Sequence, residues 1–232
     1  MKTFKKLSIS LVLLLMILPT YVASQDRIDE NDIKDMVNRN VVPTFQKTEV
    51  SGSPYVSEDF TEGSFELYSG SYASGLNMNY NLYEEGIEYI AGSETYAVDP
   101  ANIRQFILKI DGEKRTFKRG FESRRLEGDK FVEVAAEGPV NFLIKHEVSF
   151  NENVSSGYGS ATKQASYSKN ERYYFQKGDE VSNIRRLNNR RVMRYLDGNK
   201  EVEKFIDQND LDMSDPYDVA VAVRKFNKSV TQ

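Results

Sequence analysis

The chain has 232 residues, with 31 Lys and Arg against 35 Asp and Glu, and therefore a net charge of −4. It contains one histidine and no cysteine, which excludes disulfides, thiol nucleophiles, thiolate metal sites and a lipid-modified N-terminal cysteine. The acidic balance disfavours binding to bulk nucleic acid. Fourteen Tyr and 13 Phe without Trp are typical of a β-rich protein.

Residues 1–24 have the pattern of a secretory signal peptide. Three lysines (Lys2, Lys5 and Lys6) precede the apolar run 7–18, and the small residues 22–24 form a cleavage signal. The run is shorter than the about 20 residues that a membrane-spanning helix needs. We therefore expect cleavage near Ser24-Gln25 and a periplasmic or secreted bacterial protein without a transmembrane segment, of net charge about −7.

The rest of the chain divides into a leader (25–50), a β domain (51–186) and a helical segment (187–232). In the leader, Ile33, Met36 and Val37 have helical spacing and predict a short helix. The clearest strand is 76–83, where apolar residues alternate with Asn77, Asn79 and Asn81. This alternation predicts one face in the core and one face in solvent.

Turn residues predict that the strands form a meander of antiparallel hairpins. Two-residue turns are expected at Glu85-Gly86, Gly92-Ser93 and Asp111-Gly112, and a longer charged loop at 118–130. A regular strand follows at 140–150. Residues 151–170 lack apolar periodicity and predict a mobile loop, which is either a binding lid or a boundary between subdomains.

From Leu187 the apolar spacing becomes helical and predicts two or three short helices. The last helix is expected to start at Asp215-Pro216, where Asp caps and Pro occupies the first turn. Strands followed by helices predict an α+β fold. We expect an antiparallel meander, either curved or a half-barrel, with the helices packed on it.

His146 is the only histidine, and alternation places it on the apolar face of the 140–150 strand. Such a histidine is either a structural residue with a satisfied nitrogen, which we favour, or a general base. A single His without Cys disfavours a zinc site. We expect no cofactor and no metal.

Two acidic groups suggest chemistry at first sight. Glu84, Glu85 and Glu88 surround a turn, as paired carboxylates do in glycoside hydrolases, but turns are commonly acidic because they are solvated. Five aspartates between 207 and 218 do not fit a calcium loop, since Asp215 falls at the obligatory glycine. We interpret them as a capped, solvated helix junction.

Two further groups are candidates for binding. Arg186, Arg190 and Arg194 share one helical face, and we favour the acidic stretch 201–218 as their partner over an external anion such as lipopolysaccharide phosphate. Tyrosines cluster in the meander, and among them Tyr80, Tyr83 and Tyr89 are candidates for stacking on sugar or peptide. Their alternative role is packing within the strands.

Three segments together carry a resemblance: Gly52-Ser53-Pro54-Tyr55, residues 79–83 and Ile87-Glu88-Tyr89. In these segments the chain resembles a set of exported proteins of Bacteroides-group bacteria for which no activity is established. It differs from them at Asn79, where such proteins often have Arg. The resemblance implies export and an architecture of a tyrosine-rich hairpin with a helical tail, and it transfers no catalytic residue.

The sequence therefore predicts a non-enzymatic exported protein with a binding or structural role, whose partner is an envelope protein, a glycan or a lipid. One alternative is a carrier that holds an acyl chain or another hydrophobic ligand in a half-barrel. A second alternative is an envelope hydrolase. A concave site that contains His146, or two carboxylates of the Glu84 to Glu88 turn, would favour the hydrolase.

Overall fold

The computed structural model describes residues 27–28, 33, 37–40, 50–157 and 160–231. The expected signal peptide lies outside the described residues, as does most of the short helix expected after it. The strands are β1 (Val37–Asn40), β2 (Val50–Ser51), β3 (Thr61–Leu67), β4 (Tyr72–Asn81), β5 (Gly86–Ala91), β6 (Glu94–Val98), β7 (Ile103–Ile110), β8 (Glu113–Lys118), β9 (Val132–Ala136), β10 (Val140–Gly157), β11 (Ser160–Lys177) and β12 (Glu180–Ile184). The helices are η1 (Pro100–Asn102), α2 (Asn189–Tyr195), α3 (Lys200–Gln208) and α4 (Pro216–Val230).

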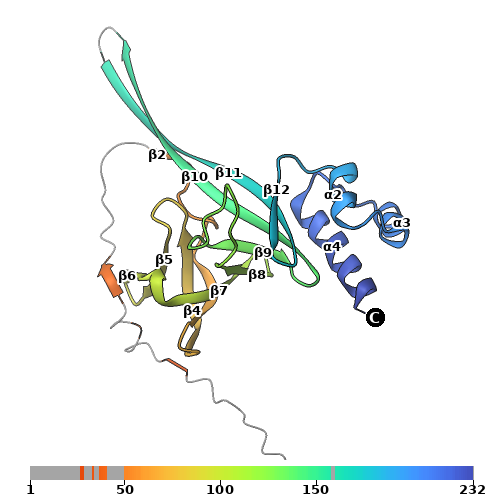
Figure 1. Cartoon of the computed structure of the whole chain (residues 1–232). Helices are drawn as coiled ribbons and strands as arrows, with labels where there is room; N and C mark the ends of the chain where they lie inside the picture. Colours follow the sequence, from red (N-terminus) through yellow and green to blue (C-terminus); the bar gives the residue numbers. More distant parts are fainter. Residues whose placement is uncertain (1–26, 29–32, 34–36, 41–49, 158–159, 232) are drawn as a thin grey trace, which may run out of the picture.

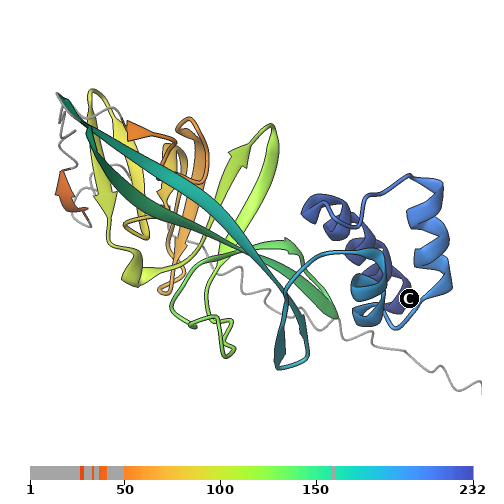
Figure 2. The same cartoon turned by 90° about the horizontal axis from the view of Figure 1, so that it is seen from above.

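All of these strands belong to one open sheet, in the order β1-β6-β5-β4-β3-β7-β8-β9-β10-β11-β12. Neighbours in this order are antiparallel, and β2 adds a short parallel pairing to β11. The three α-helices lie together at one end of the molecule, beside the start of β10 and the end of β11 (Figures 1 and 2). The predicted α+β class, an antiparallel sheet followed by helices, is confirmed. Within the described residues, no helix is both long and apolar enough to cross a membrane.

Two of the predicted hairpin turns need left-handed backbone. Glu85, between β4 and β5, has φ 54°, and Asp111-Gly112, between β7 and β8, has φ values of 54° and 82°. Glycine and aspartate tolerate this region better than most residue types, so Asp111-Gly112 favours strand reversal at that point.

The Asn-rich face of β4 is only partly in solvent: Asn77 is exposed as expected, but the rest of the face is covered. Asn79 and Asn81 are both buried, because the segment before β3 lies across them. Val56 N–H donates to the Tyr80 carbonyl at 2.9 Å, and Leu82 N–H donates to the Pro54 carbonyl at 2.8 Å. The amide of Asn79 donates to the carbonyls of Ser57 and Asp59, both at 3.0 Å. Alternation identified the two faces correctly, but it could not predict that a distant segment covers the polar one.

Residues 151–170, expected to be a mobile loop, are paired strands apart from residues 158–159, which are not described. β10 and β11 pair in an unbroken register from Val140↔Lys177 to Gly157↔Ser160 and project beyond the rest of the sheet (Figure 1). The prediction failed because two strands can pair through backbone hydrogen bonds, which any sequence provides, so this pairing needs no periodic apolar pattern.

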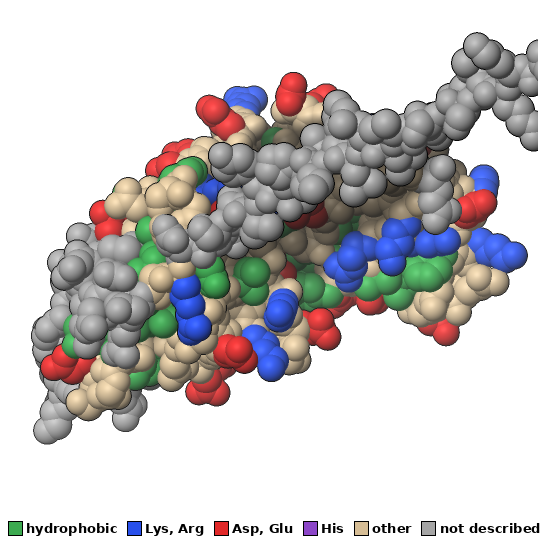
Figure 3. Space-filling model, turned by 90° about the horizontal axis from the view of Figure 1, so that it is seen from below, with side chains coloured by type: hydrophobic (Ala, Val, Ile, Leu, Met, Phe, Trp, Pro, Cys, Tyr) green, Lys and Arg blue, Asp and Glu red, His purple; other side chains and the backbone are tan. Residues whose placement is uncertain are grey.

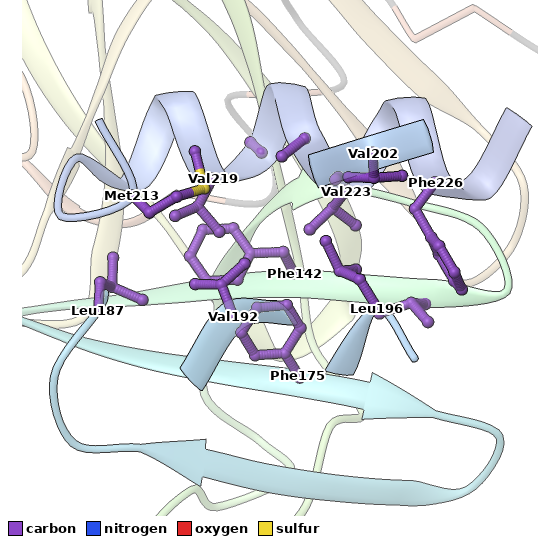
Figure 4. Close-up of a cluster of buried hydrophobic side chains, with 14 of the residues drawn as sticks. Phe142, Phe175, Leu187, Val192, Leu196, Val202, Met213, Val219, Val223 and Phe226 are labelled. Atoms are coloured by element: carbon purple, nitrogen blue, oxygen red, sulfur yellow. The ribbon is translucent and has the colours of Figure 1, made fainter. Parts of the chain in front are cut away.

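The helices cover one face of the β9–β12 end of the sheet. In Figure 4, Phe142 of β10 and Phe175 of β11 point toward Val192 of α2 and Val219 and Val223 of α4, and all five are buried. The α4 start is capped as expected: Asp215 accepts hydrogen bonds from the backbone N–H groups of Tyr217 at 2.7 Å and Asp218 at 3.1 Å. The helical segment therefore forms a continuous core with the sheet.

A second core fills the concave side of strands β3 to β8. Its centre is a cluster of aromatic rings in which Phe106 and Phe117 stack at 4.6 Å, with Phe131 at 4.9 Å and Tyr80 at 5.2 Å from Phe106. Protein side chains therefore occupy the space in which a half-barrel would hold an acyl chain. On the opposite face, the 118–130 loop covers Leu143 and Tyr174 with Leu126.

Candidate functional site

His146 lies between two carboxylates supplied by the strands on either side of β10. Glu171 is its cross-strand neighbour on β11, and Glu133 comes from β9. The ring Nε2 is 2.7 Å from Glu133 Oε2, and Nδ1 is 3.1 Å from Glu171 Oε1. With 10% of its side chain exposed, the histidine is on the inner face that alternation predicted.

Two tyrosines and an arginine extend this network to the helical segment. The Tyr173 hydroxyl donates to Glu171 at 2.8 Å, and the Tyr217 hydroxyl, from the first turn of α4, lies 3.4 Å from Glu133 Oε2. Arg115 of β8 donates to the Tyr217 hydroxyl and places its guanidinium 4.4 Å from the centre of that ring. The network therefore joins four neighbouring strands to α4.

The electrostatics favour a protonated imidazole. Burial alone acts to lower the pKa of His146, but the hydrogen bonds and charges of Glu133 and Glu171 outweigh it, so the pKa lies above its usual value. The hydrogen bond from His146 is also the main reason that the pKa of Glu171 is lowered. With both ring nitrogens donating to carboxylates, neither is available to take a proton from a substrate.

Two hollows lie beside β10 and share part of their walls, including His146 and Asn170. We call the first the histidine hollow, of about 540 Å³. Its polar wall is formed by Arg115, His146, Lys169, Glu171 and Tyr173. These charged groups already have partners, since Lys169 pairs with Glu58 at 3.2 Å and the others belong to the His146 network.

The second, which we call the lysine hollow, has a volume of about 510 Å³. Its wall includes Tyr83, Glu85, Lys145, Ser149, Ser168 and Arg172. Tyr83 is 50% exposed, and its ring makes edge contacts with Phe150 at 6.2 Å and Tyr167 at 5.8 Å. The hollow therefore combines a supported, accessible aromatic ring with hydrogen-bonding side chains.

Lys145 is the most unusual residue of the lysine hollow. It is buried in β10, and its nearest carboxylate oxygen, Glu85 Oε1, is 3.8 Å from Nζ. The two groups form an ion pair at this distance, but they are too far apart for a hydrogen bond. Burial lowers the pKa of Lys145, although Glu85 and Glu147 partly oppose the shift. No motif marks this lysine in the sequence, and only its position in a strand between Ile144 and His146 could have drawn attention to it.

The structure separates the tyrosines proposed for binding. Tyr80 and Tyr89 are packed in the core, with 2% and 1% of their surface exposed. Tyr83 alone of the three lies on the wall of a hollow. The sequence contained a signal for this difference, because Tyr83 lies in the turn after β4, next to the core residue Leu82.

The three glutamates of the β4–β5 turn have different environments. Glu85 lines the lysine hollow, whereas Glu88 is buried against Tyr55 and Asn81. Glu85 and Glu88 therefore do not form a carboxylate pair in one site. Near α4, Asp215 and Asp218 take part in helix capping, with Asp218 accepting from the Asp212 N–H at 2.8 Å. The described residues contain no group of His, Cys, Asp and Glu arranged to hold a metal ion.

Arg190 and Arg194 lie on α2, but Arg186 precedes the helix, so the three do not share one helical face as expected. All three are exposed. Among the described residues none of them forms an ion pair with the acidic stretch 201–218, where the nearest basic partner is Lys200, paired with Glu203 at 2.7 Å. Lys and Arg side chains also gather at the helical end on the face shown in Figure 3. Arg186, Arg190 and Arg194 are not among the residues that line the two hollows.

The remaining members of the site could not be predicted from single positions. Glu133, Glu171, Arg115 and Tyr217 join the His146 network from four different elements, so only the strand register and the packing of α4 on the sheet bring them together. Comparison with protein-family models, with curated proteins and with solved structures gave no match.

Proposed function

We propose that this protein is a non-enzymatic exported binding protein of the bacterial periplasm or envelope, and that its ligand is a carbohydrate bound in the lysine hollow. The observation that carries the proposal is the half-exposed ring of Tyr83 in a wall lined mainly by hydrogen-bonding groups, with Leu82 and Val148 as the apolar members. A sugar ring has an apolar face that can pack on an aromatic ring, and hydroxyl groups that both donate and accept.

The side chains around Tyr83 match such a ligand. Arg172 and Lys145 are donors, Glu85 and Glu147 are acceptors, and Ser149, Ser168 and Asn170 can act as either. The aromatic ring is held by Phe150 and Tyr167, which reduces the entropy lost on binding. Pockets with one apolar surface and several directed polar groups are typical of small-molecule sites.

The binding role is favoured over the two alternatives by particular contacts. His146 does line a concave site, but both of its ring nitrogens are held by carboxylates, which disfavours a hydrolase with His146 as base. Tyr80, Phe106 and Phe117 fill the concave core, which disfavours a carrier for an acyl chain.

The function is tested by titrating the purified protein with glucose, N-acetylglucosamine and glucuronate, followed by nuclear magnetic resonance. We expect at least one sugar to bind and to shift the resonances of Tyr83, Ser149 and Asn170. Tyr83→Ala should weaken that binding at least tenfold. The control is Tyr68→Ala, since Tyr68 is 62% exposed and is not among the residues that line the lysine hollow.

Two results would overturn the proposal: no binding of any of the three sugars, or equal affinity in Tyr83→Ala and the unchanged protein. Export is tested separately by fractionating cells and sequencing the N-terminus of the purified protein. An N-terminus at Gln25 is expected, and retention of residues 1–24 would contradict export by signal cleavage.

A further inference from the structure

We propose that the ligand of the lysine hollow is an acidic sugar, and that the Lys145 ammonium group binds its carboxylate. This inference rests on the proposed function and adds the charge of the ligand and the residue that recognises it. It is carried by the position of Lys145 in the wall of the hollow and by the contacts of the carboxylates around it.

The Lys145 ammonium has three hydrogen-bond donors and, among the described residues, no acceptor within hydrogen-bonding distance. Its side chain is 10% exposed, so water replaces these partners only in part. A buried ammonium group without acceptors is costly, and native proteins pair such groups. Since Lys145 lines the hollow, a ligand there can supply the missing acceptor.

The carboxylates closest to Lys145 are bound to other cations. Glu85 forms a shorter ion pair and a hydrogen bond with Lys130, through its other oxygen. Glu147 accepts from Arg172 Nε at 2.9 Å. Lys130 is also 3.9 Å from Glu127 and from Asp129, but both of these acids are largely exposed and point their charge into solvent. Lys145 is therefore the cation of this group whose charge is least compensated.

The electrostatics agree with this geometry. Burial is the largest influence on the pKa of Lys145 and lowers it, which means that the charged form is under-solvated in the protein. A ligand carboxylate in contact with Nζ would restore the compensation and raise the pKa again. One under-compensated cation matches the single charge of a carboxylate better than the charge of about −2 that a phosphate monoester carries at neutral pH.

The test compares glucuronate, glucose and inorganic phosphate as probes in calorimetric titrations of the purified protein. These two sugars differ at the carbon that carries the carboxylate. We expect glucuronate to bind at least tenfold more tightly than glucose and more tightly than phosphate. In Lys145→Met the two sugars should bind within about twofold of each other, because the contact specific to the carboxylate is removed. Lys145→Arg should retain a preference for glucuronate, and Lys200→Met, which removes an exposed lysine, should behave like the unchanged protein.

The outcomes separate this inference from the proposed function. Equal binding of glucose and glucuronate by the unchanged protein would contradict the role of Lys145 and leave the carbohydrate site in place. Tighter binding of phosphate, or a preference for glucuronate that survives Lys145→Met, would also overturn the inference. Binding of neither sugar would overturn the inference, and the proposed function falls with it when N-acetylglucosamine does not bind either.

Discussion

The Tyr55 hydroxyl donates a 2.8 Å hydrogen bond to the carboxylate of Glu88, which is 33 residues further along the chain. The amide of Asn81 donates to the other oxygen of the same carboxylate at 2.9 Å, and Glu88 is 2% exposed. These contacts attach the segment before β3 to the surface of β4 and β5. The same segment also lies against β11 at Gly52, which has φ 77° and where a side chain would collide with the Tyr167 carbonyl.

Removing the Tyr55 hydroxyl should destabilise the protein. Tyr55→Phe leaves a buried carboxylate with one donor fewer, and hydrogen bonds to charged groups contribute about 1.5–3 kcal/mol. We expect a loss of this size in the free energy of unfolding, measured by urea denaturation. Tyr68→Phe, at an exposed turn, is the matched control and should change it by less than about 0.5 kcal/mol. Equal effects of the two substitutions would contradict a structural role for the Tyr55–Glu88 contact.

The attachment of α4 to the sheet depends on one buried amide. Asn227 accepts from the Val140 N–H at 3.0 Å and donates to the Val140 carbonyl at 2.7 Å, so it pairs with the start of β10 as a strand would. Asn227→Leu leaves both backbone groups buried and unpaired, which should cost about 2–4 kcal/mol of unfolding free energy. Thermal denaturation monitored by circular dichroism measures this loss. Asn189→Leu, at an exposed position of α2, should be nearly neutral, and a similar loss in both would show that the amide is unimportant.

The His146 network should make stability depend on pH in a defined direction. Because the folded pKa of His146 is above the unfolded value of about 6.5, its contribution is complete below that pH and is lost as pH rises through the folded pKa. The pKa of Glu171 is lowered, so its contribution is present above the unfolded value of about 4.3 and is lost in acid, as pH falls through the folded pKa.

His146→Gln tests this dependence. The unchanged protein should exceed the variant in unfolding free energy by about 1–3 kcal/mol near pH 6, and the difference should shrink steadily toward about pH 9. Urea denaturation at a series of pH values measures it. A difference that stays constant or grows above about pH 6.5 would mean that the imidazole is not held protonated.

A ligand-binding lysine that is buried without an acceptor should reduce stability. Lys145→Met removes a desolvated charge, while Glu85 retains Lys130 as its partner, so the unfolding free energy at neutral pH should stay equal or rise by about 1 kcal/mol. Since the pKa of Lys145 is lowered, the unchanged protein gains stability as pH rises from the folded pKa toward about 10.4, and the variant should lack this gain. A marked destabilisation by Lys145→Met would indicate that Lys145 has a structural role.

Much of the fold could be predicted because its signals are local. The Asp111-Gly112 turn, the capped start of α4 and the apolar face of β10 are each encoded within a few residues, and the structure contains all three. The burial of Asn79 and Asn81 and the pairing of residues 151–170 were not predicted, because both depend on contacts that alternation does not report.

The candidate site was predicted in part for the same reason. His146 and Tyr83 stood out by residue type and strand position, and both line the lysine hollow. Lys145 did not stand out in the sequence. Its role depends on two ion pairs of other residues, Lys130 with Glu85 and Arg172 with Glu147. These ion pairs form only when folding brings the β4–β5 turn, the 118–130 loop and β11 together around Lys145, so the sequence alone does not reveal them.

The central claim is that a sugar packs on Tyr83 in the lysine hollow. The most direct measurement is the transfer of nuclear Overhauser enhancement between the Tyr83 ring protons and the ring protons of bound glucuronate. We predict strong transfer from Tyr83 and none from the exposed ring of Tyr68. Binding of glucuronate without transfer from Tyr83, or with equal transfer from Tyr68, would contradict the claim.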